Sequence, residues 1–174
     1  GTDTTYSGAA ATGSIATFTF DQLVIKNYVI LNGVASTVDL DVQSLATLTH
    51  STNSTTKVNY LDITATGNAT ITGAINLNSK GYAGGAVNTN GSGTGAGTGT
   101  ASSGAGGGGA GYGGSGGLGY TTIAGGSAYG SLTAPVDLGS GGGGGYYTST
   151  ASGGTGGGSI KLVVTGTLTL AGSV

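Results

Sequence analysis

The chain carries the runs Gly81-Tyr-Ala-Gly-Gly85, Gly106-Gly-Gly-Gly109, Gly141-Gly-Gly-Gly-Gly145 and Gly153-Gly-Thr-Gly-Gly-Gly158 within one stretch. Of its 41 glycines, 33 fall in residues 81–158. This stretch decides the fold, because it is either a flexible linker or a packed element between two strand-rich parts. Glycine loses more conformational freedom on ordering than any other residue, so a tract this dense is by default a linker.

Two features of residues 81–158 favour an ordered structure. Disordered tracts usually carry charge, whereas Asp137 is the one charged residue between Lys80 and Lys161. Large side chains also recur between the glycine runs, as packing anchors would: Tyr82, Tyr112, Leu118, Tyr120, Ile123, Tyr129, Leu132, Val136, Leu138, Tyr146 and Tyr147.

We therefore predict a packed, polyglycine-II-like insertion. Extended glycine segments with three residues per turn can lie close enough for neighbouring backbones to hydrogen bond. Tight solenoid turns are the alternative. A collagen triple helix is excluded, because the Gly-X-Y period is absent and Pro135 is the only proline.

Residues 15–80 show the pattern of short β-strands. Apolar residues alternate in segments such as Ile15–Phe20 and Val38–Val42, polar turns separate these segments, and none has a helical period with caps. The dipeptide Asn32-Gly33 is a strong turn signal and predicts the end of a strand. Residues 159–174 return to the same strand pattern.

A weak repeat of about 20 residues runs through the strand-rich part. Three sets of residues are in register: Phe18, Val38 and Val58; Phe20, Leu40 and Tyr60; Ile25, Leu45 and Ala65. Such a period is typical of a β-solenoid with one turn of chain per repeat. We predict an all-β, parallel β-helix-like solenoid that carries the glycine-rich insertion. A β-sandwich is the alternative, because strands at this spacing also suit antiparallel sheets.

A length of 174 residues is typical of one domain. We divide it into an extended N-terminal segment (1–14), a β-strand-rich part (15–80), the glycine-rich insertion (81–158) and closing β-strands (159–174). The N-terminal segment is small and polar, so it is either a frayed terminus or an extension that pairs with a neighbouring subunit.

The composition favours an extracellular or cell-surface protein. Charged residues make up 6% of the chain, against about a quarter in an ordinary globular domain. A start at Gly1 is typical of a processed chain, and the absence of cysteine is compatible with secretion. The chain lacks the basic patch that phosphate contacts require, so we predict no nucleic-acid binding. No apolar run approaches the ~20 residues that span a bilayer.

Three segments resemble a known family: Ala74–Gly85, Tyr129–Gly143 and Gly153–Leu170. The family comprises glycine-rich microbial cell-surface and extracellular proteins with parallel β-helices, in which a GGxGGG run leads into a strand of the type I-x-L-x-V-x-G-x-L-x-L-x-G. The resemblance is good over residues 60–174 and loose over 15–60. The glycine packing also resembles the polyglycine sandwiches of some phage adhesin tips. The resemblance implies a surface location and carries over no catalytic residue.

Chemistry-bearing residues are few. Asp39-Leu-Asp41 places two carboxylates on one face of a strand, where they could bind Ca²⁺ or transfer protons, but we interpret them as a solvated strand surface. His50, the only histidine, lies in a Ser/Thr turn that does not suit a catalytic triad. We therefore predict no catalytic residue, no metal site and no cofactor, and a protein that is not an enzyme.

Two kinds of surface residue remain as candidates. An exposed aromatic ring can stack on a sugar or on a neighbouring subunit, which makes three tyrosines the predicted contact or assembly residues: Tyr112, Tyr146 and Tyr147. Asn-x-Ser/Thr sequons predict N-glycosylation at three positions: Asn53, Asn68 and Asn90.

These patterns together predict a secreted structural protein. A solenoid ends in unpaired strand edges that must be capped or stacked, and Gly172-Ser-Val174 offers no polar cap. We expect head-to-tail self-assembly into an extracellular filament or surface matrix. The alternative is an adhesin that binds a glycan or receptor. A third hypothesis is ice binding through Thr-x-Thr strands such as Thr167-Leu-Thr169.

Overall fold

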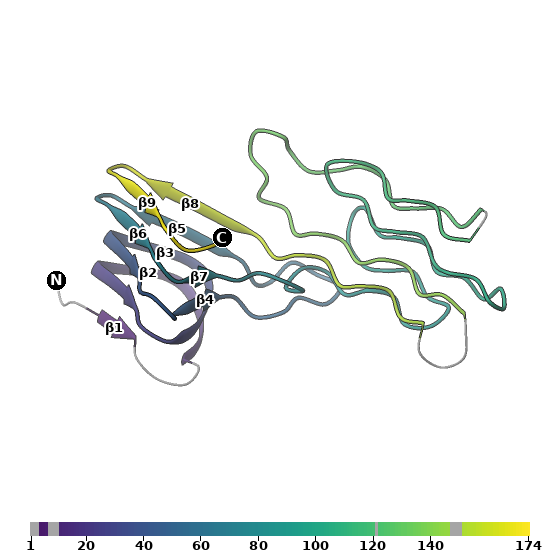
Figure 1. The fold of residues 1–174 in the computed structure, drawn as a ribbon, viewed down its shortest axis with the longest axis horizontal. Helices are drawn as coiled ribbons and strands as arrows, with labels where there is room; N and C mark the ends of the chain where they lie inside the picture. Colours follow the sequence, from purple (N-terminus) through teal and green to yellow (C-terminus); the bar gives the residue numbers. More distant parts are fainter. Residues whose placement is uncertain (1–3, 7–10, 121, 147–150) are drawn as a thin grey trace. The chain divides into compact units, whose positions relative to one another are not determined.

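Two units that interleave along the sequence make up the chain (Figure 1). The first contains Gly1–Ser51, Asn59–Leu77 and Ile160–Val174, and the second contains Thr52–Val58 and Asn78–Ser159. The structure is a computed structural model that describes residues 4–6, 11–120, 122–146 and 151–174, with side chains from residue 19 onward.

All secondary structure in the described residues is β-structure. The named strands all belong to the first unit: β1 (Thr4–Tyr6), β2 (Ala11–Ile25), β3 (Tyr28–Val42), β4 (Thr47–Thr49), β5 (Leu61–Ala65), β6 (Ala69–Ile71), β7 (Ala74–Ile75), β8 (Ile160–Val164) and β9 (Leu168–Leu170). Within the described ranges there is no helix, and hence none that could cross a membrane. The predicted all-β class is confirmed.

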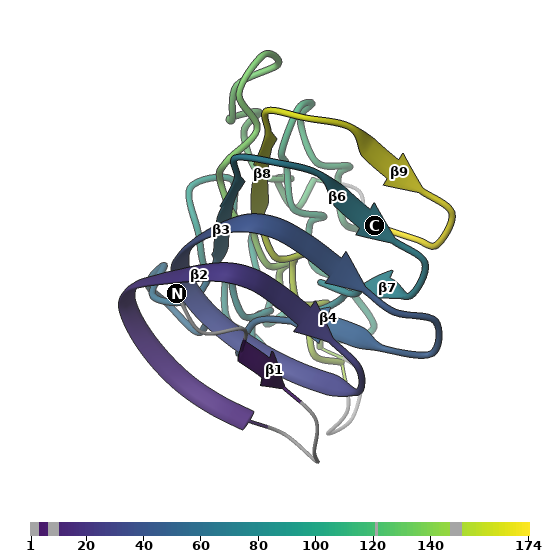
Figure 2. The ribbon, with the colours of Figure 1, turned by 90° about the vertical axis from the view of Figure 1, so that its left-hand side faces the viewer.

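Every ladder between the named strands is parallel. The sheet runs in the order β1-β2-β3-β4-β7, β5 and β6 also pair with β3, and β8 and β9 follow them. Parallel strands usually need a connection of a dozen or more residues, yet only Lys26 and Asn27 separate β2 from β3. The curl of the sheet explains this, because it brings the end of each long strand back beside its own start (Figure 2). The antiparallel β-sandwich is therefore wrong for the described strands.

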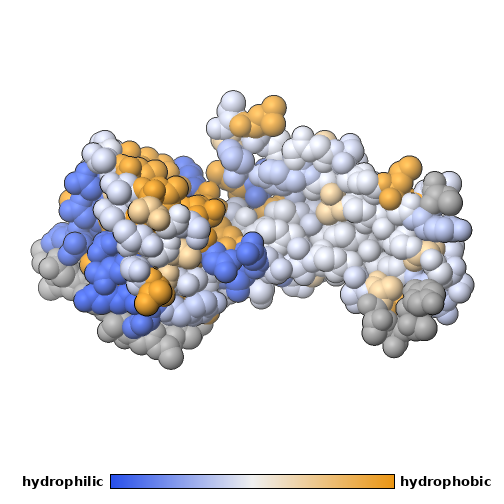
Figure 3. Space-filling view, viewed as in Figure 1, coloured by the Kyte–Doolittle hydropathy of each residue, from blue (hydrophilic) through white to orange (hydrophobic). Residues whose placement is uncertain are grey.

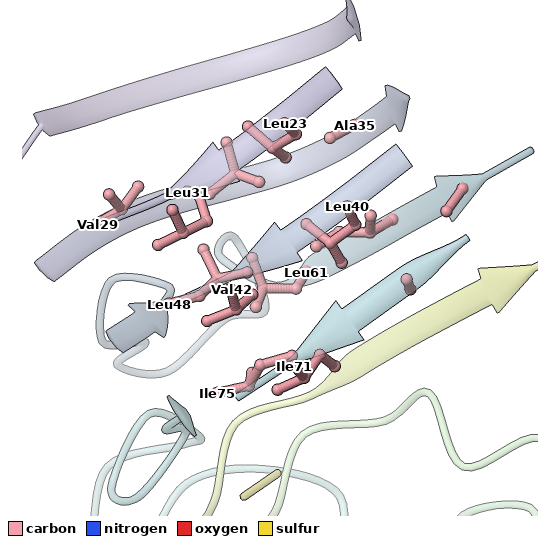
Figure 4. Close-up of a cluster of buried hydrophobic side chains, with 14 of the residues drawn as sticks. Leu23, Val29, Leu31, Ala35, Leu40, Val42, Leu48, Leu61, Ile71 and Ile75 are labelled. Carbon is pink, nitrogen blue, oxygen red and sulfur yellow. The ribbon is translucent and has the colours of Figure 1, made fainter. Parts of the chain in front are cut away.

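The core lies inside the curl and is built from matching positions of successive strands (Figure 4). Alternate residues of a strand point to opposite faces, so in-register parallel pairing stacks apolar residues on apolar residues. Leu23 pairs with Leu40 and Leu40 with Ala69, and all three are at most 1% exposed. Each fully buried Leu or Ile stabilises the fold by about 1.5–3 kcal/mol.

The predicted 20-residue register is wrong. Leu40 pairs with Leu23, 17 positions earlier, and with Ala69, 29 positions later, whereas Phe20 pairs with Thr37. Leu45, which the repeat placed inside, is 97% exposed. The spacing between paired residues is not constant along the sequence, because the connections between successive strands of the curled sheet differ in length.

The dipeptide Asn32-Gly33 does not end a strand, because β3 continues through it. Gly33 adopts a φ of 98°, which suits glycine, and the β2–β3 register shifts opposite this point. The Asn32 side chain donates to Ser51 Oγ (3.0 Å) and accepts from the Ser51 N–H (2.8 Å). The turn signal therefore bends the strand instead of reversing it.

The chain leaves the first unit twice to form the second. Thr52–Val58 lies between β4 and β5, and Asn78–Ser159 lies between β7 and β8. Because β4 pairs with β7, the two excursions start at neighbouring positions of the sheet. Because β5 pairs with β8, they also end at neighbouring positions. The predicted insertion, 81–158, falls within the second unit.

The N-terminal segment is partly described. Residues 4–6 form β1, which pairs with Leu23–Ile25 of the same chain, and β2 begins at Ala11. The rest of the predicted extension, residues 1–3 and 7–10, lies outside the described residues.

Candidate assembly interface

Strands β8 and β9 form an outer edge of the sheet. Among the described residues, β8 pairs with β5 alone and β9 with β6 alone. The corner between them is also bonded inward, since the Gly166 N–H donates to Gly67 O (2.8 Å) and the Thr167 N–H to Asn68 Oδ1 (2.9 Å). A strand edge of this kind is a template for pairing with another chain.

The apolar side chains of this edge are uncovered where those of the preceding turn are buried. Ala69 and Ile71 of β6 are 0% and 1% exposed, but their partners in β9, Leu168 and Leu170, are 50% and 53% exposed. The difference follows from position in the sheet, because among the described residues β6 has strands on both sides and β9 pairs with β6 alone.

Strand β8 repeats this contrast more weakly. Leu61, Ile63 and Ala65 of β5 are all buried. Their partners in β8 are half-buried: Ile160, Leu162 and Val164. In Figure 3 apolar atoms gather over the part of the first unit where Figure 1 places β8 and β9. Exposed contiguous apolar surface in a soluble protein marks an interaction site.

The second unit has a different construction, with a three-residue period in its backbone hydrogen bonds. Gly139, Gly142 and Gly145 each donate to the segment 151–157 and each accept from the segment 82–88, at 2.7–3.2 Å. Residues three positions apart therefore face the same neighbour, as in a backbone with three residues per turn.

Between these positions the same segment bonds to another neighbour. Gly141 and Gly144 accept from the segment 97–100, both at 3.0 Å. Both are buried, and a β-carbon on Gly141 would overlap the carbonyl oxygen of Ala83, as one on Gly144 would overlap that of Ala86. Close backbone approach, and not flexibility, requires glycine here.

Four hydroxyl and backbone groups are connected by a series of hydrogen bonds inside the second unit. The Gly95 N–H donates to Ser140 Oγ (2.9 Å), Ser140 Oγ donates to Tyr129 Oη (2.9 Å), and Tyr129 Oη donates to the Leu138 carbonyl. The Tyr112 ring meets the Tyr129 ring edge-on at 5.0 Å. Burial raises the pKa of Tyr129, opposed by its hydrogen bond with Ser140.

The two predicted contact tyrosines that the structure describes differ in their surroundings. Tyr112 packs against Tyr129 and is only partly exposed. Tyr146 is 40% exposed and forms an antiparallel bridge with Ala105. Tyr147 lies outside the described residues. Sequence reasoning missed the exposure of Leu168 and Leu170, because it depends on which strands pair with β9 and not on the pattern of β9 itself.

The three sequon asparagines differ in their surroundings. Asn53 is 8% exposed, its Nδ2 donates to Lys80 O (2.9 Å) and its Oδ1 accepts from the Val58 N–H (2.8 Å), so it holds a loop of the second unit. In the folded chain the Asn53 amide is buried and already bonded, and glycosylation at Asn53 stays a prediction. Asn68 and Asn90 are exposed and stay as predicted sites.

The acidic pair is half-buried, whereas the histidine is fully buried. Asp39 and Asp41 line a surface hollow of about 320 Å³, and each is bonded locally: Asp39 Oδ1 accepts from the Asn68 N–H (2.7 Å) and Asp41 Oδ2 from Gln43 Nε2 (3.1 Å). His50 is fully buried. The described part of the chain has no group of three or more His, Cys, Asp or Glu that could hold a metal ion.

Comparison of the chain with protein-family models, with curated proteins and with solved structures found no significant match.

Proposed function

We propose that this chain is a secreted, non-enzymatic structural protein, the self-assembling subunit of an extracellular filament or surface matrix. One observation carries the proposal: Leu168 and Leu170 of β9, which among the described residues pairs with β6 alone, are half exposed, while the matching residues Ala69 and Ile71 are buried. A second copy of this chain is the occupant that the edge suits, because it offers strands of the same apolar pattern.

The finer architecture we propose is a β-solenoid with a polyglycine-II-like insertion. The curl that returns β2 to the start of β3 after two residues supports the solenoid. The three-residue hydrogen-bond period of Gly139, Gly142 and Gly145 supports the polyglycine-II-like packing. The low charge and the absence of cysteine support the extracellular location.

Sedimentation and electron microscopy over a range of protein concentrations test the function. The unchanged chain should form larger particles as its concentration rises. Leu168→Asp/Leu170→Asp should stay monomeric, because a charge on a buried edge is costly to desolvate. Ser103→Asp/Thr122→Asp adds the same charge at exposed positions of the second unit and should assemble normally. Monomers of the unchanged chain at every concentration would refute the proposal.

A second candidate is an adhesin, favoured by exposed apolar residues in loops of the second unit. Leu118, Tyr120 and Leu132 are 71%, 63% and 91% exposed. Glycan-array binding that is lost in Tyr120→Ala would support it, and Tyr120→Phe, which keeps the ring, is the matched control. Ice binding has less support, because the outward register line Asp41–Thr70–Thr169 mixes residue types and forms no regular threonine array. Thermal hysteresis would test it.

A further inference from the structure

We infer that Asn90 is a site of spontaneous deamidation in the folded chain, whereas the fold protects Asn32 from the same reaction. The two asparagines share one feature, since each is followed by glycine, in Asn32-Gly33 and in Asn90-Gly91. The inference concerns a chemical modification of the chain, and it does not rest on the proposed self-assembly.

Deamidation begins when the main-chain nitrogen after an asparagine loses its proton to solvent base and attacks the asparagine side chain. At Asn90 the Gly91 nitrogen forms a bond to Cγ, the bond between Cγ and Nδ2 breaks, and Nδ2 takes a proton and leaves as ammonia. Water then opens the cyclic succinimide. The product is aspartate where the new bond breaks and isoaspartate where the original peptide bond breaks. Glycine favours the attack because it has no side chain to hinder ring closure.

The surroundings of Asn32 hold both reacting groups in place. The Gly33 N–H, which contains the attacking nitrogen, donates to the Tyr60 carbonyl (2.7 Å). The Asn32 side chain bonds to Ser51 through both Nδ2 and Oδ1. The dipeptide also lies within β3, where β2 pairs on one side and β5 on the other. Attack at Cγ therefore requires the middle of the sheet to open, and core strands open with a free energy close to that of global unfolding.

Asn90 is exposed and lies in the second unit, outside the named strands. Its side chain bonds through Oδ1, which accepts from the Gly99 N–H (2.8 Å), and the Gly91 N–H donates to the Gly97 carbonyl (2.9 Å). Both bonds end on one short segment, 97–99, so a single local opening frees the attacking nitrogen and the amide together. An exposed segment outside a sheet opens at a lower free-energy cost than a core strand.

The packing around Asn90 gives the modification a structural consequence. Isoaspartate adds one carbon atom to the main chain between residues 90 and 91, where the backbone has no spare room. A β-carbon on Gly91 would already overlap the carbonyl oxygen of Gly141, and the same oxygen accepts from the Gly97 N–H. Formation of isoaspartate therefore disturbs the contact between these segments of the second unit.

Peptide mapping by mass spectrometry, after incubation of the folded chain at mildly alkaline pH, tests the inference. Asn90 should convert at least about ten times faster than Asn32, because a difference of about 1.4 kcal/mol in the cost of local opening gives that ratio. In urea the two sites should convert at similar rates, since neither is then held by the fold. Asn88 is the internal control: it is exposed but followed by threonine, so it should remain an amide.

Each outcome decides for or against the inference. Conversion of Asn90 in the folded chain, with Asn32 intact until urea is added, supports it. Equal conversion of both asparagines in the folded chain overturns it, and so does a folded chain in which both remain amides. Conversion of Asn88 as fast as Asn90 also overturns it, because exposure and not the following glycine would then decide. Failure of Asn90 to react even in urea overturns it as well.

Discussion

The two units of this chain are packed in different ways, one through side chains and the other through direct contact between backbones. In the first, inward side chains such as Leu40 and Ile63 fill the curl of a parallel sheet. In the second, residues such as Gly141 and Gly144 bring backbones into direct contact, with no side chain between them. The first unit is stabilised mainly by apolar burial, and the second mainly by a network of backbone hydrogen bonds.

Each unit is therefore destabilised by a different kind of substitution. A side-chain core loses stability when a large residue becomes smaller, because a cavity remains. A backbone-packed unit loses stability when a glycine gains even one carbon, because overpacking displaces whole segments. Replacement by alanine therefore removes atoms from the side-chain core of the first unit, whereas in the second unit it adds a carbon atom between closely packed backbones.

The largest effect should come from Gly141→Ala. Its β-carbon would overlap the backbone at Ala83, so the segments around it must separate and break hydrogen bonds. We expect a loss of about 3 kcal/mol or more, the upper range for overpacking. Hydrogen exchange should show lost protection over 82–100 and 138–145, with the first unit intact.

Gly154→Ala is the matched control, because a β-carbon there would meet nothing within 4 Å. It should be neutral or stabilising by up to about 1 kcal/mol, through lower entropy of the unfolded chain. Equal damage from both substitutions would mean that glycine is needed here for flexibility and not for close approach.

The sequence predicts which segments form strands or packed segments better than it predicts the pairing register of the strands. Alternating apolar residues predict strands, and uncharged glycine runs with anchors predict packing, because these signals are local. The register depends on connection lengths between turns, which a weak repeat cannot supply: Leu45 matched the repeat and is exposed. The exposure of Leu168 could not be predicted from its own strand, because it depends on which of the described strands pair with β9.

In the first unit, Ile63→Ala should cost about 2–5 kcal/mol, because Ile63 is fully buried and its removal leaves a cavity. Leu162 pairs with Ile63 but is half-buried on the outer strand. Leu162→Ala should cost less in the isolated chain, about 1 kcal/mol or slightly more. Urea unfolding measures both. In the assembled protein the difference between the free-energy costs of the two substitutions should become smaller. A difference that does not change on assembly would argue against burial of β8.

A moderate effect is expected at Tyr129, where the second unit uses a side chain to join its segments. Tyr129→Phe removes the hydrogen bond to the Leu138 carbonyl and should cost about 1–2 kcal/mol. Ser127→Ala, at an exposed position two residues earlier in the chain, should change little.

The same tyrosine predicts a pH dependence. Burial raises the pKa of Tyr129, so the folded state holds the phenol proton more tightly than the unfolded chain. The resulting stability is fully present below the ordinary tyrosine pKa of about 10 and is lost as pH rises from there through the folded pKa. Urea unfolding between neutral and alkaline pH should show this loss in the unchanged protein, and Tyr129→Phe should weaken it. An unchanged slope in the variant would assign the loss to other groups.

The smallest effect should come from the ion pair on the outer face of the sheet. Lys161 Nζ lies 3.5 Å from Asp62 Oδ2, and both side chains are partly exposed. Water and salt screen such a pair, so Lys161→Gln should cost less than about 1 kcal/mol and the cost should shrink further in high salt. Urea unfolding at low and high salt measures it, with Lys26→Gln as the control for loss of one positive charge. A cost that is large and independent of salt would show that the outer face depends on this contact, and that charge as well as apolar stacking holds β8 on β5.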